Sequence, residues 1–335
     1  MNLIKLLLLA SFFNAVSWII IIPVWQYPDE QAHFAQIQDL AEIGYAPVGV
    51  NNTSYEIALS EEILGTQRDI FGNNKFTYHP EYKIAYSQSF NGLQEAEIVN
   101  LTRSARVNFV KDEATNNPPL YYNTGAQVYK LFDSTNLFSR VYVLRFLSVL
   151  FFLFTVYLAY KIGQEIFPHN KSLAYVLKIM IAFKPMFVFS STGVIPDSLT
   201  NLLFTVVIYL CIKMISQGLK LKFLALSAIT MTAGVLTRQN FLLATFILLF
   251  PIIYQTFQNR RLWLPVSIGL FSTIAFISFT TTLGRDIPIL SNFRFGQDTN
   301  FDPLIFLEKD FLTYLKFILS QNYAQIWPCY WGVYK

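Results

Sequence analysis

The sequence has few cysteines and few charged side chains. Only Cys211 and Cys329 occur among its 335 residues. One lies inside an apolar run and the other near the end, so the sequence indicates neither a disulfide framework nor a cysteine metal site. Charged residues make up 14% of the chain and apolar residues 53%, whereas about a quarter of the residues in an ordinary soluble domain are charged. This composition is typical of a membrane protein.

The motifs of soluble nucleotide chemistry are also missing. The sequence has no Gly-rich phosphate loop, and neither a zinc-type nor a Ser-His-Asp signature surrounds His79 or His169. The basic net charge does not indicate nucleic acid either, because it is unevenly spread. Residues 26–138 hold 14 of the 21 acidic and 7 of the 25 basic residues, so this stretch is net −7 and the remainder is +11. Membrane topology accounts for that remainder, and we expect no nucleic-acid partner.

The sequence is instead rich in long apolar runs. A membrane helix needs about 20 mainly apolar residues to cross about 30 Å of hydrocarbon. Seven stretches qualify, of which the fifth is the shortest: Leu3–Ile22, Val141–Tyr160, Ser172–Phe189, Leu199–Ile215, Phe223–Leu236, Phe241–Phe257 and Leu262–Leu283. We expect the first stretch to be a membrane anchor and not a signal peptide, because it is long and has no clear small-x-small cleavage site.

The short loops predict the orientation, because Lys and Arg in such loops favour the cytoplasm. Basic residues fall in three alternate connections: Lys161 and Lys171; Lys213, Lys220 and Lys222; Arg260 and Arg261. We therefore expect an all-α polytopic membrane protein in four parts. Residues 1–25 form the first transmembrane helix, 26–138 an extracytoplasmic loop with amphipathic helices, 139–284 transmembrane helices two to seven, and 285–335 an extracytoplasmic segment.

Two segments of the long acidic loop have structural signals. Between Glu30 and Ile43, apolar residues recur at helical spacing and Gly44 is a natural stop, which predicts an amphipathic helix against the outer membrane face. The sequence NNPPLYY, residues 116–122, combines a stiff Pro-Pro unit with two tyrosines suited to the membrane interface. We expect the chain to re-enter the membrane zone there, and a structural role is the favoured interpretation of this segment.

The best candidate for an active site follows the first span. Asp29 and Glu30 are adjacent carboxylates, and His33 lies four residues after Asp29, on the same face if a helix starts here. The alternative is that Asp29 caps the helix and Glu30 complements its dipole. Capping leaves His33 unexplained. Both interpretations can hold together, because a cap fixes a carboxylate rigidly, as a catalytic base requires.

Four further residues are candidates for binding a phosphate-bearing substrate. Asp197 stands at the outer start of the fourth span, where a capping role is the alternative and free helix amides attract phosphate. Arg238 lies in a very short outer connection, against the positive-inside trend, which suggests an anionic lipid partner. Lys184 and Arg145 lie roughly one to two turns below the outer surface and can serve the same phosphate. The alternative for these three cations is snorkelling to the interface.

Four short motifs give the sequence a resemblance to a known superfamily. They are PDEQAHF at 28–34, NPPLYY at 117–122, IPDSL at 195–199 and WGVY at 331–334. In this order the chain resembles the GT-C superfamily of lipid-carrier-dependent glycosyltransferases, especially the bacterial relatives of protein O-mannosyltransferases and aminoarabinose transferases. The resemblance implies a GT-C-like bundle of about seven transmembrane helices in a bacterial plasma membrane. Family members continue through further spans, so we expect this chain to be truncated before additional helices.

The resemblance also implies roles for individual residues. Asp29 is expected to be the catalytic aspartate, with Glu30 supporting it and His33 part of the site. Arg238, and less directly Lys184, are expected to bind the phosphate of a polyprenyl-phosphate sugar. That donor would carry its own activated sugar, so no soluble cofactor is needed. Its acceptor would be a glycan, a lipid or a protein, and membrane lipids would surround the chain.

Two other classes of function remain open from the sequence. A lipid-linked sugar flippase or transporter would have charged or broken helices near the bilayer midplane and internal repeats, and we find no repeat. A noncatalytic membrane assembly protein would leave Asp29 replaceable. A divalent cation at Asp29 and Glu30 is a further option, although two adjacent carboxylates alone do not define a metal site. The glycosyltransferase hypothesis requires Asp29 and Arg238 to converge on one side of the membrane.

Overall fold

The computed structural model describes residues 3–47, 51–67, 92–112 and 117–259. The chain divides into two compact units, Met1–Ser267 and Ile268–Lys335, and every described residue belongs to the first. The predicted seventh span Leu262–Leu283, the segment 285–335 with its WGVY motif, and the residues Arg260 and Arg261 lie outside the described part of the chain.

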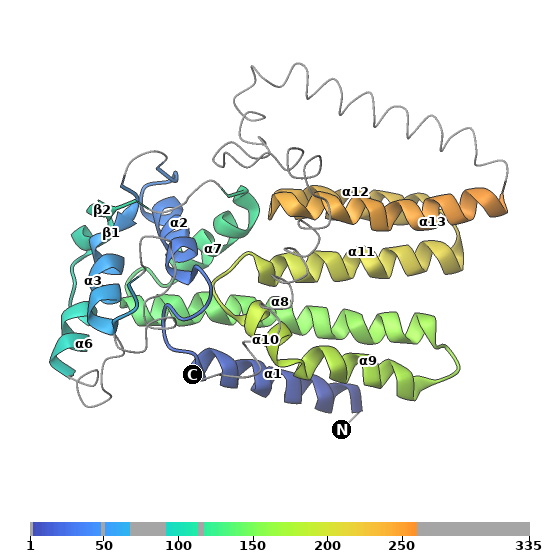
Figure 1. Ribbon diagram of the computed structural model, residues 1–335, viewed down its shortest axis with the longest axis horizontal. Coiled ribbons are helices and arrows are strands. Elements are labelled where there is room, and N and C mark those ends of the chain that lie inside the picture. The colour runs from blue at the N-terminus through green and yellow to red at the C-terminus, as the bar shows by residue number, and fades with distance from the viewer. Residues whose placement is uncertain (1–2, 48–50, 68–91, 113–116, 260–335) are drawn as a thin grey trace, which may run out of the picture. The chain divides into compact units, whose positions relative to one another are not determined.

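The described residues are mostly helical and form two groups (Figure 1). One group, which we call the bundle, contains α1 (Leu3–Ile21), α8 (Leu137–Ile166), α9 (Lys171–Phe183), α10 (Pro185–Thr192), α11 (Asp197–Gln217), α12 (Leu221–Val235), η3 (Gln239–Leu243) and α13 (Ala244–Gln258). The other, which we call the head, contains α2 (Glu30–Glu42), β1 (Thr53–Ser54), α3 (Tyr55–Leu64), α6 (Gly92–Val99), η2 (Arg103–Arg106), β2 (Phe109–Lys111) and α7 (Pro119–Leu131). The head gathers at one end of the bundle.

Four helical segments of the bundle are long and apolar enough to cross a membrane: α1, α8, α11 and the segment Gln239–Gln258. The pair α9 and α10 adds a fifth candidate if the two helices are counted as one span. Helix α12 is apolar but has only 15 residues. The described helices therefore agree with a polytopic helical membrane protein, whereas the total of seven spans stays a prediction.

The third predicted span, Ser172–Phe189, is not one continuous helix. It breaks into α9 and α10, which are bent by 60° at Lys184. Pro185 explains the break, because proline has no backbone N–H and its ring clashes with the preceding turn. The amide Nδ2 of Asn14, in the middle of α1, donates a 2.9 Å hydrogen bond to the carbonyl of Ala182 beside the break. This bond satisfies an acceptor at a place where the helix ladder is interrupted.

The head departs from the predicted all-α class by a short antiparallel sheet, in which β1 pairs with β2. Helix α2 has nearly the predicted bounds, and Gly44 after it adopts a positive φ of 87°. Nine of its thirteen residues are buried within the protein, so α2 is not a helix with one face left open, and its place on the membrane face stays a prediction. It packs against α7, at a spot where a Cβ on Gly125 would come within 2.7 Å of Ile37 Cδ1.

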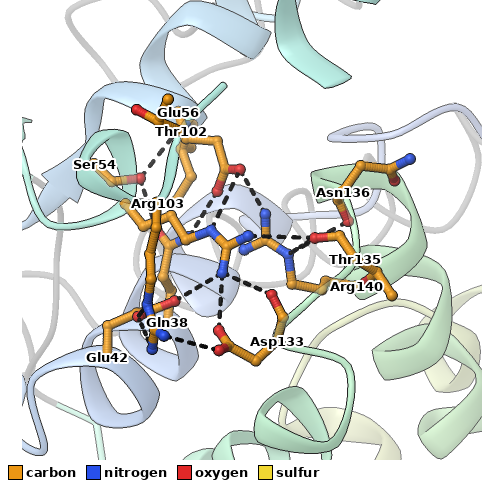
Figure 2. A network of polar contacts seen from close by, with 12 residues as sticks. Gln38, Glu42, Ser54, Glu56, Thr102, Arg103, Asp133, Thr135, Asn136 and Arg140 are labelled. Carbon is orange, nitrogen blue, oxygen red and sulfur yellow. Dashed lines mark hydrogen bonds and ion pairs between the residues drawn. The ribbon is translucent and has the colours of Figure 1, made fainter. Parts of the chain in front are cut away.

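A network of buried charges joins the head to α8 (Figure 2). Arg140, in the first turn of α8, is fully buried and donates from Nη2 to Glu56 Oε1 at 2.5 Å. Arg106 of η2 donates from Nη1 to Glu42 at 3.2 Å and to Asp133 at 2.8 Å. Because Arg140, Glu56, Arg106 and Glu42 are buried and paired, removing one of them would leave an uncompensated charge. The network thus holds the head against the end of the bundle.

Candidate functional site

Asp29 stands between the end of α1 and the start of α2. It is exposed and has a left-handed backbone conformation with φ 54°, which Asp tolerates better than most other residues. Asp29 occupies the N-cap position of α2, but its side chain makes no capping hydrogen bond. The interpretation of this carboxylate as a helix cap is therefore wrong.

Glu30, the next residue, points away from the surface and is fully buried. Its carboxylate accepts hydrogen bonds from Arg145 Nε at 2.8 Å and Nη2 at 2.6 Å. It also accepts from the backbone N–H groups of Trp25 at 3.0 Å and Val194 at 3.2 Å. Trp25 has a positive φ of 66°, which is strained for a bulky residue. Glu30 thus holds both the turn that precedes Asp29 and the loop after α10.

Arg145 uses all of its hydrogen-bond donors within the protein. A guanidinium has five N–H groups. Besides the two bonds to Glu30, Nη1 and Nη2 donate to three backbone carbonyls at the end of α1: Ile19 at 3.0 Å, Ile22 at 2.6 Å and Pro23 at 2.8 Å. The expected role of Arg145 in phosphate binding does not fit this geometry, because no donor is left for a ligand. The same pairing occupies both oxygens of Glu30, so the geometry suits this carboxylate to hold its neighbours in place.

Tyr27 fills the space between Arg145 and the loop after α10. The Arg145 guanidinium lies 4.7 Å from the centre of the Tyr27 ring, and the phenol is 2.9 Å from Thr192 Oγ1. Burial raises the pKa of Tyr27 to about 12, although Thr192 and Arg145 oppose the shift. Gly193 is required beside this ring, because a Cβ there would come within 2.5 Å of Tyr27.

His33 and Tyr122 meet next to Asp29. The Nδ1 atom of His33 lies 2.8 Å from the hydroxyl of Tyr122, and the backbone N–H of His33 donates to the Asp29 carbonyl at 3.0 Å. Burial raises the pKa of Tyr122 well above its usual range; the charge of Arg238 lowers it and that of Asp29 raises it. The contact with His33 ties Tyr122 to the turn that bears Asp29, and the bond from Leu120 to the carbonyl of Leu236 ties the same helix to the segment that bears Arg238.

Arg238 and Asp197 form an ion pair through Nη1 and Oδ1. Their side chains are 44% and 38% exposed, so the pair lies at the surface. The N-cap position of α11 is Pro196, so Asp197 is the first residue inside the helix and not its cap, and its carboxylate pairs with Arg238. The N–H of Leu120, at the start of α7, donates to the carbonyl of Leu236 at 2.8 Å and holds the Tyr122 helix beside Arg238.

We call the group Asp29, His33, Tyr122, Asp197 and Arg238 the rim site. Sequence reasoning missed Tyr122, because two adjacent tyrosines after a Pro-Pro unit favoured a structural interpretation. The sequence did contain a signal: proline is common at the first position of a helix. Pro119 occupies that position in α7, and Tyr122 lies in the first turn.

Lys184 does not belong to the rim site. It is exposed at the break between α9 and α10 and precedes the first residue of α10, whereas Thr192 is the last residue of that helix. The eight residues of α10 separate it from the loop before α11 by about 12 Å along the helix axis. The structure therefore brings Arg238 and Asp197 together without Lys184.

A divalent cation shared by Asp29 and Glu30 does not fit the geometry. Both oxygens of Glu30 accept bonds from Arg145 and are buried, whereas Asp29 is exposed. Within the described ranges, no three His, Cys, Asp or Glu side chains gather in a way that would hold a metal ion. Asp29 and Glu30 therefore do not form a shared metal site.

These features define a polytopic helical membrane protein whose polar head carries a cluster of ionisable residues at one end of the bundle. A family model described as "Predicted membrane protein (DUF2142)" matches residues 12–300, and the chain belongs to this family. No curated protein and no solved structure matches the chain. The family description agrees with the membrane character of the bundle and names no reaction.

Proposed function

We propose that this protein is a glycosyltransferase of the GT-C type, which transfers a sugar from a polyprenyl-phosphate carrier to a glycan, lipid or protein acceptor. One observation carries the proposal: α7 contacts both candidate segments. The hydroxyl of Tyr122 lies 2.8 Å from Nδ1 of His33, one turn after Asp29, and the N–H of Leu120 donates to the carbonyl of Leu236 at 2.8 Å, two residues before Arg238. A carboxylate, an imidazole and a guanidinium thus belong to one region, where the head meets the bundle. That combination can accept a proton and bind a phosphate within one site.

In the proposed reaction, Asp29 is the general base. Its carboxylate would accept the proton of an acceptor hydroxyl while the oxygen attacks the anomeric carbon and the bond from that carbon to the phosphate oxygen breaks. The leaving group is the phosphate of the carrier lipid, and its oxygen keeps the electron pair of the broken bond. Arg238 would stabilise the negative charge that develops on this leaving group. His33, bonded to Tyr122, would shape the polar surroundings of the base.

The charge distribution supports a rim site outside the cytoplasm. The connections α8–α9 and α11–α12 lie at the end of the bundle opposite to the head (Figure 1). Five lysines belong to that end: Lys161, Lys171, Lys213, Lys220 and Lys222. Since short basic loops favour the cytoplasm, the head would face the outside of a plasma membrane, as the GT-C resemblance implies for a bacterial host.

The break between α9 and α10 favours a second candidate, a lipid-linked sugar flippase. Broken helices at membrane depth are typical of transporters. The break lies opposite Asn14 in the middle of α1, and the exposed Lys184 stands at it. The glycosyltransferase remains our first proposal, because the ionisable residues that converge lie at the head end and not at the break.

A transfer assay tests the proposal. The full chain would be reconstituted in lipid nanodiscs with a panel of radiolabelled polyprenyl-phosphate sugars and a membrane extract as acceptor source. We expect Asp29→Asn to lower the rate of label transfer by about 10²- to 10⁴-fold, as expected for a general base. The matched control is Asp112→Asn, which removes one exposed carboxylate elsewhere in the head.

Unchanged transfer by Asp29→Asn would contradict the proposal. In sealed vesicles, movement of labelled lipid between leaflets without any transfer would identify a flippase instead, and Lys184→Gln would then be expected to slow that movement. Absence of both activities, with Asp29→Asn folded and behaving as the wild type, would favour a noncatalytic assembly protein.

A further inference from the structure

The Asp197–Arg238 ion pair differs from the other arginine pairs that anchor the head. Glu30 and Arg145 are both fully buried, and Arg140 and Glu56 are 0% and 2% exposed. Those pairs are permanent, because separating buried charges is strongly unfavourable. The side chains of Arg238 and Asp197 are 44% and 38% exposed. Exposed ion pairs contribute little net stability, so this pair can exchange partners.

Arg238 has the capacity for another anion. Its Nη1 atom pairs with Oδ1 of Asp197, which is its acidic partner among the described residues. A guanidinium carries five N–H groups in a fork that matches two oxygens of a phosphate. Phosphate forms parallel charge-assisted bonds with arginine, so it competes with a single carboxylate oxygen.

Asp197 is well placed to oppose that phosphate. Its carboxylate stands at the first residue of α11 and faces Arg238 rather than capping the helix. A phosphate bound to the same guanidinium would lie close to this carboxylate, and two negative charges at short range repel. The carboxylate therefore stabilises the empty site and destabilises the loaded one.

We propose that Asp197 is an exchangeable counter-ion of Arg238. It neutralises and orients the guanidinium while the site is empty, gives way when an anionic lipid phosphate binds, and helps to expel the phosphate afterwards. Asp197 thus competes with the ligand, whereas the sequence suggested that it binds the substrate. The inference rests on the proposed function for the identity of the ligand, a polyprenyl phosphate.

A binding experiment without any sugar tests this role. The full chain in nanodiscs of neutral phosphatidylcholine would be titrated with polyprenyl monophosphate, and occupancy read by native mass spectrometry. We expect Asp197→Asn to tighten binding by about two- to five-fold, in line with the small net energy of exposed pairs. Arg238→Gln should weaken binding, and Asp197→Glu, which keeps the charge, should bind as the wild type does.

Two controls make the comparison specific. Asp112→Asn removes another exposed carboxylate of the head and should leave binding unchanged, which separates a local effect from net charge. A parallel titration with inorganic phosphate distinguishes a free phosphate from a lipid headgroup. The same order of variants with both probes would support the counter-ion and show that the phosphate group itself is recognised.

Equal or weaker binding by Asp197→Asn, with thermal unfolding like that of the wild type, would overturn the proposal and make Asp197 a positioning residue for Arg238. Binding that does not depend on Arg238 would overturn it as well. Sugar transfer is measured separately. If the variants bind in the expected order and no transfer occurs, the counter-ion stands and the glycosyltransferase proposal fails.

Discussion

Glu30 and Arg145 form a fully buried ion pair, with 2.6 Å between Oε2 and Nη2. The pair lies where α1 ends, α2 begins and α8 passes, and Glu30 also accepts the N–H of Val194 from the loop before α11. Asp29 is adjacent to Glu30, and Asp197 follows Val194 by three residues. One ion pair thus positions both chain segments that carry acidic residues to the rim site.

Glu30→Gln tests this positioning role. We expect it to lower the free energy of unfolding by about 3–5 kcal/mol, because it leaves the buried Arg145 charge unpaired. Thermal unfolding in detergent or nanodiscs would measure the change. Glu62→Gln, at an exposed position of α3, is the control and should have little effect. If Glu30→Gln unfolds like the wild type but no longer transfers sugar, Glu30 takes part in the chemistry instead.

Tyr122→Phe tests the contact with His33. The variant keeps the buried ring and loses the hydroxyl that lies 2.8 Å from Nδ1. We expect a stability loss of about 0.5–1.5 kcal/mol, the usual net value of one hydrogen bond, together with slower transfer and a shifted ¹⁵N signal of the His33 ring. Tyr121→Phe removes a neighbouring buried hydroxyl and should leave the His33 signal in place. An unshifted signal in Tyr122→Phe would rule out the contact.

Asp39 predicts a pH dependence of stability. Burial raises the pKa of this carboxyl from 3.8 to about 8, and both of its oxygens lack a hydrogen-bond partner among the described residues. Between pH 3.8 and about 8 the folded state keeps a proton that the unfolded chain has lost, so stability falls as the pH rises. The slope reaches about 1.4 kcal/mol per pH unit.

Asp39→Asn should flatten this part of the profile, because the amide does not titrate. Urea unfolding curves at a series of pH values would measure the difference between variant and wild type. Parallel profiles for the two proteins would show that Asp39 does not hold its proton in the folded state.

The two arginines of η2 should differ in importance. Both bond to Glu42, but the Arg103 side chain is 66% exposed and that of Arg106 only 9%. We expect Arg106→Gln to destabilise the protein by about 3–5 kcal/mol and Arg103→Gln to change the unfolding temperature little. Equal effects of the two substitutions would contradict the assignment of Arg106 to the buried network.

The same network makes the free energy of unfolding depend on pH in the acidic range, through Glu42. Burial opposes ionisation of Glu42, but hydrogen bonds from Arg103, Arg106 and Tyr129 outweigh it and lower the pKa of this carboxyl. Its stabilising contribution is therefore fully present above the ordinary pKa and is lost as the pH falls through the lowered value. Glu42→Gln should remove this loss below about pH 4, the ordinary range of a glutamate.

Local patterns predicted the helices well. Apolar runs located α1, α8, α11, α12 and α13, and the spacing of apolar residues located α2 to within one residue of its observed end at Glu42. They did not predict features that depend on tertiary packing. Helix α2 is mostly buried within the protein, and the third predicted span breaks at Pro185. The total of seven spans and the side of the membrane that the head faces stay predictions.

The candidate residues were found by their type and their position at span ends, which the sequence shows directly. Their partners were not found. Arg145 looked like a phosphate ligand beside Arg238, but its donors are occupied by Glu30 and by the end of α1. Only packing reveals whether an arginine at a given depth is saturated or open to a ligand.

By itself the sequence determined the membrane character of the chain, the positions of most helices and the choice of Asp29, His33 and Arg238 as candidates, because these depend on local composition and spacing. The tertiary structure alone decided which charges pair: Glu30 with Arg145 in the core, and Asp197 with Arg238 at the surface. The physical reason is that ion pairing depends on distance and burial in space, and these partners are far apart along the chain.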